Sequence, residues 1–259
     1  MQTSRHETDI LRIVRLTGSC TIAELAEQLS VSDETVRRHI RPLVRKGLVE
    51  KVHGAVVVPD RLREPPLERR MQERRAAKQA IAGAVANLVQ DGESLILDTG
   101  STTTYVALAL RRRTRLSVVT NSTDIARTLA AQSGNRVYLA GGEVNSDNAA
   151  AFGAAALAFV RSFRVRHVIL SIGAVDPVGG EFLDYQLAEA EFSQAAMGQA
   201  DRVTVVADHS KFSNKGLVKV CDLDQVHCFV TDQAPPGSFR DALAASNTSL
   251  IVAERSGEP

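Results

Sequence analysis

Two kinds of hydrophobic periodicity divide the chain. Over residues 1–58 apolar positions recur at helical spacing and are followed by two short β-prone runs, which predicts small helices and then a hairpin. Over residues 75–254 strand-like apolar runs alternate with helix-like segments. Residues 59–75 contain three prolines and many charges but little apolar periodicity, so we expect a solvated linker there. The predicted domains are therefore residues 1–58 and 76–259.

The longer region predicts an α/β domain. Strands that alternate with helices are typical of an open, mainly parallel sheet with helices on both faces, which is a Rossmann-like arrangement. Ligands of such sheets bind outside the carboxyl ends of the strands. The predicted strands are Ser94–Asp98, Leu116–Thr120, Arg136–Ala140, His167–Gly173, Arg202–Asp208, Gln225–Asp232 and Ser249–Glu254.

The N-terminal region has the layout of a helix-turn-helix. Thr21, with Glu24 three residues further on, forms a capping box that begins the second of three predicted helices. After a short turn, Ser32 caps the third helix. A helix, a short turn and a capped helix are typical of the helix-turn-helix. The two β-prone runs around His53-Gly54 predict a hairpin, or wing. The buried stripe of the third helix is Val36, Ile40 and Leu43.

Basic side chains gather on the outward face of the third helix. When the apolar stripe faces inward, Thr35 and Arg38 point outward, and Arg37 and Arg45 lie on the flanks. Arginine contacts guanine with two parallel donors and also clamps phosphates. A solvated charged face is the alternative, but the capped turn, the helix and the hairpin coincide with the basic face and favour DNA binding. The residues assigned to DNA contacts are Ser32, Thr35, Arg37, Arg38, Arg41, Arg45, Lys51 and His53.

The low net charge of the chain strengthens the case that this basic patch binds DNA. Lysine and arginine number 31 and aspartate and glutamate 30, so the formal net charge is only +1 and affinity for DNA has to come from a local surface. The three cysteines are odd in number and lack C-x-x-C spacing, so we predict neither a disulfide framework nor a zinc site. The start of the chain is too polar for a signal peptide, and no apolar run approaches the ~20 residues of a membrane span. We expect a cytoplasmic protein without a membrane partner, metal or cofactor.

Polar, glycine-rich loops follow the carboxyl ends of the predicted strands. Residues 99–104 place a glycine and five hydroxyl side chains between a strand and a helix, and such a helix N-terminus favours a phosphate group. The nucleotide P-loop pattern is absent. Lys211 supplies a point charge for the phosphate, while Asp98, Asp176 and Glu189 either accept bonds from ligand hydroxyls or serve as caps and ion-pair partners. The sequence therefore predicts a pocket for a small phosphorylated, hydroxyl-rich ligand.

An enzyme is the alternative class. Carboxylates and a lysine around a sugar phosphate can transfer a proton between the carbons of an aldose and a ketose. No motif fixes the acid and base geometry, and a DNA-binding module has no evident purpose in a plain isomerase. We therefore predict no catalytic residues.

Several ordered motifs resemble the DeoR family of bacterial repressors, over essentially the whole chain. Val31–Arg38 resembles the helix-turn-helix signature of that family, and Val52–Ala55 resembles its wing. The segments that resemble its sensor domain are Asp98–Thr103, Val119–Ser122, Ala140–Gly142, Phe152-Gly153, Glu189–Glu191 and Ala207–Phe212. Within the family, four segments resemble the repressors of glycerol 3-phosphate metabolism, namely Leu139–Glu143, Ser162–Arg164, Ala207–Phe212 and Thr231–Pro236.

This resemblance implies a sensor fold related to ribose-phosphate isomerases and glucosamine-phosphate deaminases, without their activity. It also implies a repressor, usually a homodimer or homotetramer, that binds double-stranded operator DNA and is induced by a phosphorylated sugar or polyol, such as glycerol 3-phosphate. An activator with the same two modules stays open, as does an isomerase with a regulatory DNA-binding domain. The resemblance implies effector contacts for ten residues, and we add Thr103 because it belongs to the same hydroxyl-rich loop. The full set is Asp98, Gly100, Ser101, Thr102, Thr103, Thr120, Asn121, Gly142, Gly153, Glu189 and Lys211.

Three local features depart from the family pattern or from a regular helix. The chain has His39-Ile40 where the family commonly has Asp-Leu, and only Gly54 where the wing commonly has two glycines. Pro42 lies inside the third helix and removes one N–H, so we expect a bend near Arg41 or a break there. These departures bear on the operator sequence and the wing contacts.

Overall fold

The computed structural model describes residues 5–17, 19–45, 48–52, 54–57, 64–131 and 134–254. The chain forms two compact units, residues 1–63 and 64–259, which are called here the N-terminal unit and the C-terminal unit. No helix among the described residues is long and apolar enough to cross a membrane. All three cysteines are buried, and none forms a disulfide.

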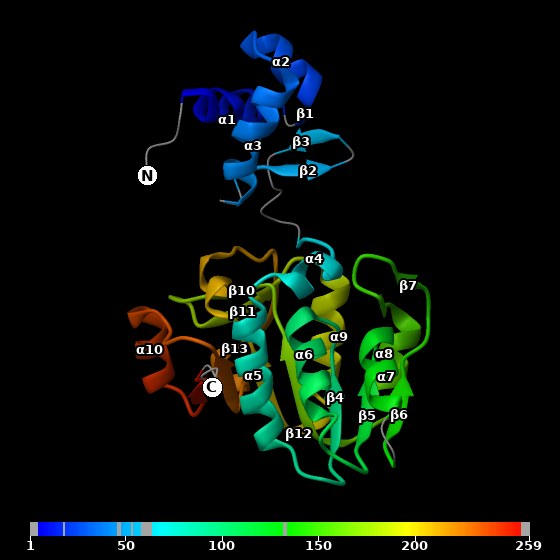
Figure 1. Ribbon diagram of the computed structural model, residues 1–259. Helices are drawn as coiled ribbons and strands as arrows, with labels where there is room; N and C mark the ends of the chain where they lie inside the picture. The colour runs from blue at the N-terminus through cyan, green and yellow to red at the C-terminus, as the bar shows by residue number, and fades with distance from the viewer. Residues whose placement is uncertain are drawn as a thin grey trace, which may run out of the picture. The chain divides into compact units, whose positions relative to one another are not determined.

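The N-terminal unit packs helices against a small antiparallel sheet (Figure 1). Its strands pair in the order β1-β3-β2. The predicted three helices and the wing are present, and β1 adds a strand that the hydrophobic pattern did not predict. The elements are α1 (Arg5–Thr17), β1 (Ser19–Thr21), α2 (Ile22–Leu29), α3 (Asp33–Arg45), β2 (Glu50–Val52) and β3 (Ala55–Val57).

Both predicted caps are confirmed. Thr21 N donates to Glu24 Oε2 at 2.7 Å and Glu24 N donates to Thr21 Oγ1 at 3.2 Å, which completes the capping box of α2. Ser32 Oγ accepts from Thr35 N at 3.3 Å at the start of α3. The predicted stripe of α3 is fully buried in a core that also holds Ile10 and Val14 of α1.

Pro42 does not end the third helix. α3 continues through it to Arg45, so the alternative of a break at this position is wrong. Leu43, which follows Pro42, has no exposed surface. Its burial in the core of the N-terminal unit keeps the last turn in place despite the missing N–H.

The C-terminal unit contains a seven-stranded sheet in the order β15-β14-β12-β9-β4-β5-β6, in which all pairs are parallel. These are the seven predicted strands. They are β4 (Ser94–Leu97), β5 (Ser117–Thr120), β6 (Arg136–Leu139), β9 (Val165–Ser171), β12 (Ala200–Val206), β14 (Cys228–Thr231) and β15 (Ser249–Val252). The helices are α4 (Leu67–Gln72), α5 (Arg75–Leu88), α6 (Ser101–Leu110), α7 (Thr123–Ala130), α8 (Ala154–Val160), α9 (Leu187–Met197) and α10 (Gly237–Ala244), with short 3-10 turns η1 (His209–Ser213) and η2 (Leu223–Gln225).

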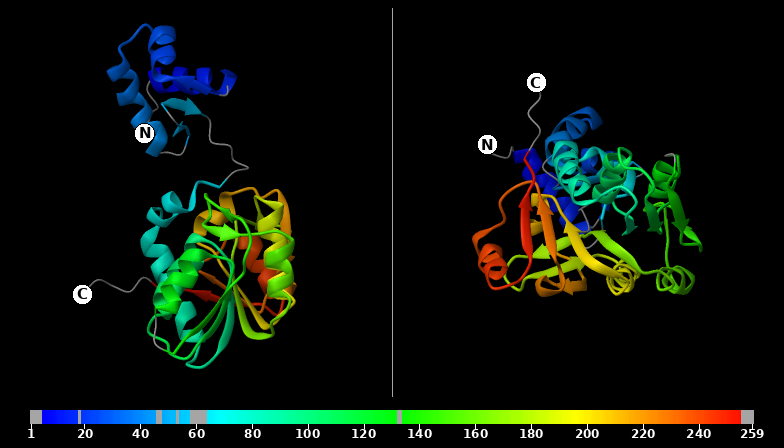
Figure 2. Two further views of the ribbon diagram at one scale, coloured as in Figure 1. Left: turned by 90° about the vertical axis from the view of Figure 1, so that its right-hand side faces the viewer. Right: turned by 90° about the horizontal axis from the view of Figure 1, so that it is seen from below.

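Helices cover both faces of this sheet (Figure 2). Leu95 and Leu97 of β4 belong to a core with α5, α6 and α7, while Ile96 between them belongs to a second core with α8 and α9. Successive side chains of a strand point to opposite faces, so a strand buried on both sides reads as a continuous apolar run. This explains why the predicted strands could be recognised from apolar runs alone.

Two smaller sheets were not predicted. One is antiparallel in the order β10-β11-β13, and the other pairs β7 with β8. Their strands are short, so they carry little periodic signal. The strands are β7 (Val144–Asn145), β8 (Ala150–Ala151), β10 (Ala174–Asp176), β11 (Glu181–Asp184) and β13 (Val218–Asp222).

Residues 64–75 are not a solvated linker. They include α4 and the first residue of α5, and the side chains of Leu67 and Arg70 are buried. Leu67 N donates to Asp147 O at 2.8 Å, which fixes α4 to the loop between β7 and β8. The predicted linker residues 59–63 lie outside the described residues. Within this segment Arg70 makes polar contacts with Glu64 and Asn148, whereas Leu67 is buried and Met71 packs against a hydrophobic core.

The separate core of the N-terminal unit predicts a local effect of Ile40→Ala. Ile40 is fully buried, and removing such a side chain costs about 2–5 kcal/mol. Hydrogen exchange of peptides from α1–α3 should accelerate accordingly, while peptides from β4 and β9 keep their wild-type rates. Gln28→Ala, at an exposed position of α2, is the control. Equal acceleration in both units would contradict the division into two cores.

Candidate nucleic-acid interface and candidate ligand pocket

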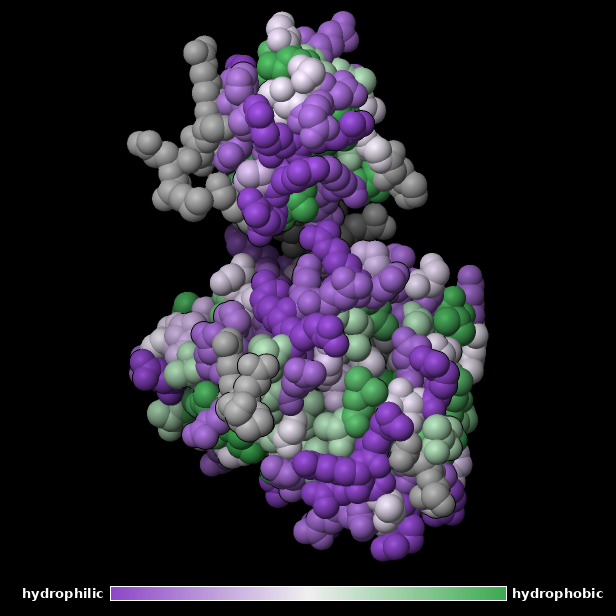
Figure 3. Space-filling view, in the orientation of Figure 1, coloured by the Kyte–Doolittle hydropathy of each residue, from purple (hydrophilic) through white to green (hydrophobic). Residues whose placement is uncertain are grey.

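Four predicted DNA-contact residues of the N-terminal unit share one surface hollow. Arg38, Arg41 and Arg45 of α3 line it together with Lys51 of β2, and all four are exposed. Pro42 and Val44 complete the lining. Hydrophilic side chains dominate the face of this unit seen in Figure 3. The helix and the wing therefore present their cations on a common face.

The other predicted DNA-contact residues lie apart from this hollow. Ser32 and Thr35 are at the N-terminus of α3, where their hydroxyls are 3.0 Å apart. Arg37 Nη2 lies 4.0 Å from Asp33 Oδ2, and both side chains are about half exposed. His53 lies outside the described residues.

The candidate ligand pocket lies at the carboxyl edge of the parallel sheet. In the sheet, β5 and then β6 lie on one side of β4, and β9 lies on its other side. The order in which the strands follow one another along the chain therefore reverses between β4 and β9. Sheets of this type bind ligands at such a switch point. Here Asp98, which follows β4, accepts hydrogen bonds from Ser171 N, at the end of β9, at 3.0 and 3.1 Å. Thr99 N in turn donates to Asn121 Oδ1 at 3.0 Å.

Gly100 allows the end of β9 to approach the loop that begins α6. A Cβ atom at this position would lie 1.9 Å from Ser171 Oγ, so only glycine fits. Thr103 Oγ1 and Thr104 Oγ1 both donate to Gly100 O, at 3.1 and 2.7 Å. These two hydroxyls therefore stabilise the first turn of α6, whereas Ser101 and Thr102 line the pocket.

The structure brings six of the predicted effector residues together. Asp98, Ser101, Thr102, Asn121, Glu189 and Lys211 line one pocket. Gly100, Thr103, Thr120, Gly142 and Gly153 are not among the lining residues, and neither is Asp176, which accepts from Val178 N. The complete lining is Glu64, Arg70, Asp98, Thr99, Ser101, Thr102, Asn121, Phe152, Ser171, Ile172, Asp184, Glu189, Phe192, Ser193 and Lys211.

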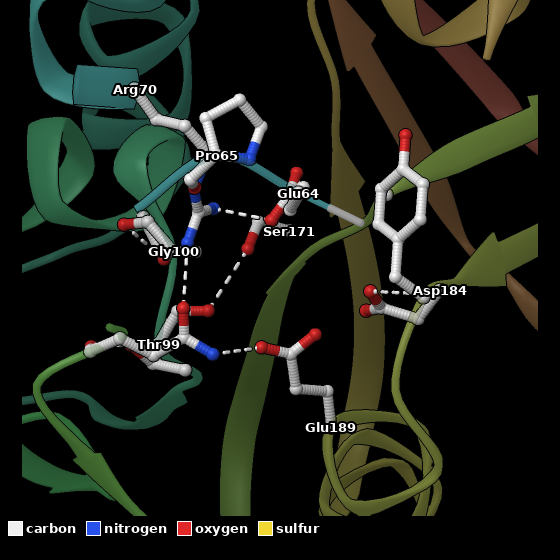
Figure 4. Close-up of polar contacts among 12 residues, drawn as sticks. Glu64, Pro65, Arg70, Thr99, Gly100, Ser171, Asp184 and Glu189 are labelled. Carbon is white, nitrogen blue, oxygen red and sulfur yellow. Dashed lines mark hydrogen bonds and ion pairs between the residues drawn. The ribbon is translucent and has the colours of Figure 1, made fainter. Parts of the chain in front are cut away.

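Two charged residues that the sequence analysis missed lie at the centre of this pocket. Glu64 Oε1 is 2.6 Å from Lys211 Nζ, and Glu64 Oε2 is 2.6 Å from Arg70 Nη1. Figure 4 shows the Arg70 side chain pointing toward Glu64. The two residues come from the predicted linker, where a dense run of charges hid them. The neighbouring prolines, Pro65 and Pro66, were the one local sign that the backbone of this segment has a defined conformation.

The ion pairs decide the protonation of these groups. Burial alone would raise the pKa of Glu64, but the charges of Lys211 and Arg70 outweigh burial and lower it. Burial would also lower the pKa of Lys211, yet the Glu64 carboxylate raises it. Glu64 and Lys211 are therefore both charged near neutral pH.

Burial raises the pKa values of three other carboxyls in the pocket. Burial raises the pKa of Asp98 despite its bonds from Ser171. Burial, together with nearby carboxylates, raises the pKa of Asp184 to about 6 and that of Glu189 to about 9. Asn148 Nδ2 donates to Glu189 Oε1. Asp184 was also missed by the sequence analysis, because no motif marks it.

The pocket combines groups that suit a phosphorylated polyol. Lys211, Arg70 and the N-terminus of α6 favour an anion, whereas Asp98, Asn121 and Glu189 offer hydrogen bonds to hydroxyls. No group of three or more potential metal ligands occurs among the residues that the structure describes.

Two family models match the two units of this chain. The model described as "DeoR-like helix-turn-helix domain" matches residues 5–61. The model described as "DeoR C terminal sensor domain" matches residues 73–233, which is more than half of the chain.

Curated relatives cover nearly the whole chain. The HTH-type transcriptional repressor CsqR of Escherichia coli is 32% identical over 96% of this chain and 94% of its own length. The glycerol-3-phosphate regulon repressor of the same species is 32% identical over 96% of this chain and 98% of its own length. The solved structure of ribose 5-phosphate isomerase A from Methanocaldococcus jannaschii covers 52% of this chain and 53% of its own, with 18% identity and a TM-score of 0.38.

The raised pKa of Glu189 predicts how stability changes with pH. The folded chain holds this proton up to about pH 9, while an unfolded glutamate releases it near ~4.3. The folded state thus binds more protons between these values, and the free energy of unfolding falls as pH rises through this window. Glu189→Gln removes the part of the fall that this residue causes and should stabilise the protein by about 1 kcal/mol or more at pH 8, but not at pH 4.

Urea unfolding between pH 4 and pH 8.5 measures this difference. Glu191→Gln, at an exposed position of the same helix, is the control and should follow the wild-type curve. A Glu189→Gln curve parallel to wild type would show that Glu189 is ionised in the folded state.

Proposed function

Since the chain belongs to the DeoR family of transcriptional regulators, we propose that it represses an operon by binding operator DNA through α3 and the wing. A phosphorylated sugar or polyol that fills the pocket of the C-terminal unit releases the repressor. The observation that carries this proposal is the buried cation pair of Arg70 and Lys211 beside the N-terminus of α6. Cations at this position of a parallel sheet suit a phosphate group.

Glycerol 3-phosphate is the first effector to test. One relative is named a glycerol-3-phosphate regulon repressor, and four segments of the chain resemble repressors of that metabolism. The pocket supplies cations for the phosphate and acceptors for the two hydroxyls of this compound. We also expect a homodimer or homotetramer that binds two-fold related half-sites.

Fluorescence anisotropy on DNA from the promoter region of the protein's own gene tests the proposal. We expect tight binding at a stated salt concentration, and release by glycerol 3-phosphate or by one member of a sugar-phosphate panel. Binding that no phosphate compound weakens would refute the effector role. Turnover of a sugar phosphate by the purified protein would favour the isomerase alternative, and DNA binding that a ligand strengthens would favour an activator or co-repressor arrangement.

Replacing Arg38 with alanine is expected to weaken specific DNA binding. Arg38 is exposed near the middle of α3, on the face shared with Lys51. Loss of one base contact costs about 1–3 kcal/mol, which is a loss of about tenfold or more in operator affinity. Affinity for the phosphorylated ligand should stay at the wild-type value, because the pocket belongs to the other unit.

Arg12→Ala is the matched control for this variant. It removes the same charge from α1, where Arg12 is 71% exposed. A small loss that disappears at higher salt is expected for it. Equal losses for the two variants, or wild-type operator affinity for Arg38→Ala, would contradict the assignment of α3 as the recognition helix.

A further inference from the structure

Glu64 occupies the pocket as a ligand would. Each of its carboxylate oxygens contacts a different cation at 2.6 Å, Lys211 on one side and Arg70 on the other. The side chains of Glu64, Arg70 and Lys211 are only 11%, 10% and 14% exposed. A carboxylate that bridges two buried cations makes the same charge-assisted hydrogen bonds as a phosphate group.

The pocket has no room for a ligand while Glu64 is in place. Its free volume is about 20 Å³, which accommodates one water molecule. A phosphate ester of a three-carbon polyol is several times larger. An effector that binds here therefore has to displace a side chain, and the residue to be displaced is the one whose charge it replaces.

Glu64 differs from the other carboxylates of the pocket in the part of the chain that carries it and in the contacts that hold it. Asp98 is fixed between β4 and β9 by Ser171, and Asp184 accepts from the backbone N of Tyr185 at 2.8 Å. Glu64 instead precedes α4 and is the first residue of the C-terminal unit, directly after the N-terminal unit in the sequence. It can leave the pocket without disturbing the sheet.

The two residues after Glu64 favour such a movement. Pro65 and Pro66 have no backbone N–H, so their own nitrogens hold no hydrogen bond that would have to break. Pro65 O accepts from Arg70 Nε at 2.9 Å, so the same guanidinium holds both the carboxylate and the backbone of this segment. A ligand that engages Arg70 competes with both contacts.

We propose that Glu64 is a tethered occupant of the anion site formed by Arg70 and Lys211, and that the phosphate group of the effector displaces it. This rests on the proposed function in one respect, because it takes the effector to be a phosphate compound bound in this pocket. Displacement replaces one carboxylate by a group of higher charge and frees the chain at residue 64. Occupancy of the pocket is thereby transmitted to the segment that joins the two units.

Glu64→Gln tests the displacement directly. The amide keeps the size of the side chain but loses its charge, so it competes poorly for the two cations. Isothermal titration with glycerol 3-phosphate and with inorganic phosphate should show binding about tenfold tighter than wild type, since close buried charge pairs contribute at least this much. Glu68→Gln, at an exposed position of α4, is the control and should match wild type.

The opposite result has a distinct meaning. If Glu64 accepts hydrogen bonds from ligand hydroxyls instead, Glu64→Gln binds glycerol 3-phosphate more weakly than wild type, and the proposal is overturned. Equal affinities overturn it as well. If neither protein binds any phosphate compound, the proposed function fails together with the displacement. If wild type binds and the variant binds no tighter, only the displacement fails.

A measurement on the wild-type protein covers the case in which the variant does not fold. Hydrogen exchange of the peptide 64–72 should become faster when glycerol 3-phosphate is added, because the displaced segment loses contacts. Peptides from β4 and α6 should become slower, because they line the filled pocket. Slower exchange in residues 64–72 on adding ligand would mean that the segment closes over the ligand, and would overturn the proposal.

Discussion

The burial of charge at the carboxyl edge of the parallel sheet is the constraint on which the C-terminal unit depends. An unpaired ion in such a place is strongly destabilising, so every charged group needs a partner. Arg70 satisfies this demand by contacting Glu64, Pro65 O and Asn148 Oδ1, the last at 3.0 Å. The Arg70 guanidinium therefore connects α4 to Glu64 and to the β7–β8 loop.

The same constraint explains the protonation pattern of the pocket. Burial lowers the pKa of Lys78 to about 8, and its ammonium donates to the carbonyl oxygens of Arg70 and Glu73. Burial, together with nearby carboxylates, raises the pKa values of Asp184 and Glu189, and Glu189, whose pKa is about 9, holds its proton near neutral pH. The pocket thus contains a charged carboxylate, Glu64, between its two cations and a protonated one, Glu189, which suits a ligand with both an ionic and a hydroxylated part.

Much of the architecture could be predicted from the sequence, because strands buried on both faces and capped helices leave strong local patterns. Asp98, Asn121 and Lys211 were found for the same reason, since each follows a predicted strand at the edge where ligands bind. Glu64 and Arg70 could not be found in this way. Their role depends on a contact of Glu64 with Lys211 across 147 positions of the sequence, and no periodicity records such a pairing. The short strands β10, β11 and β13 were missed because a few residues are too few to show a period.

The attachment of Glu64 to the chain has a consequence for the sensitivity of the protein. A group tethered through a short connection competes at an effective concentration on the order of millimolar, whatever the amount of protein present. The level of effector that fills the pocket is then set by the tether as well as by the pocket's own contacts. Changes of length or stiffness at Pro65 and Pro66, which connect Glu64 to α4, would retune the response threshold without altering any residue that touches the operator.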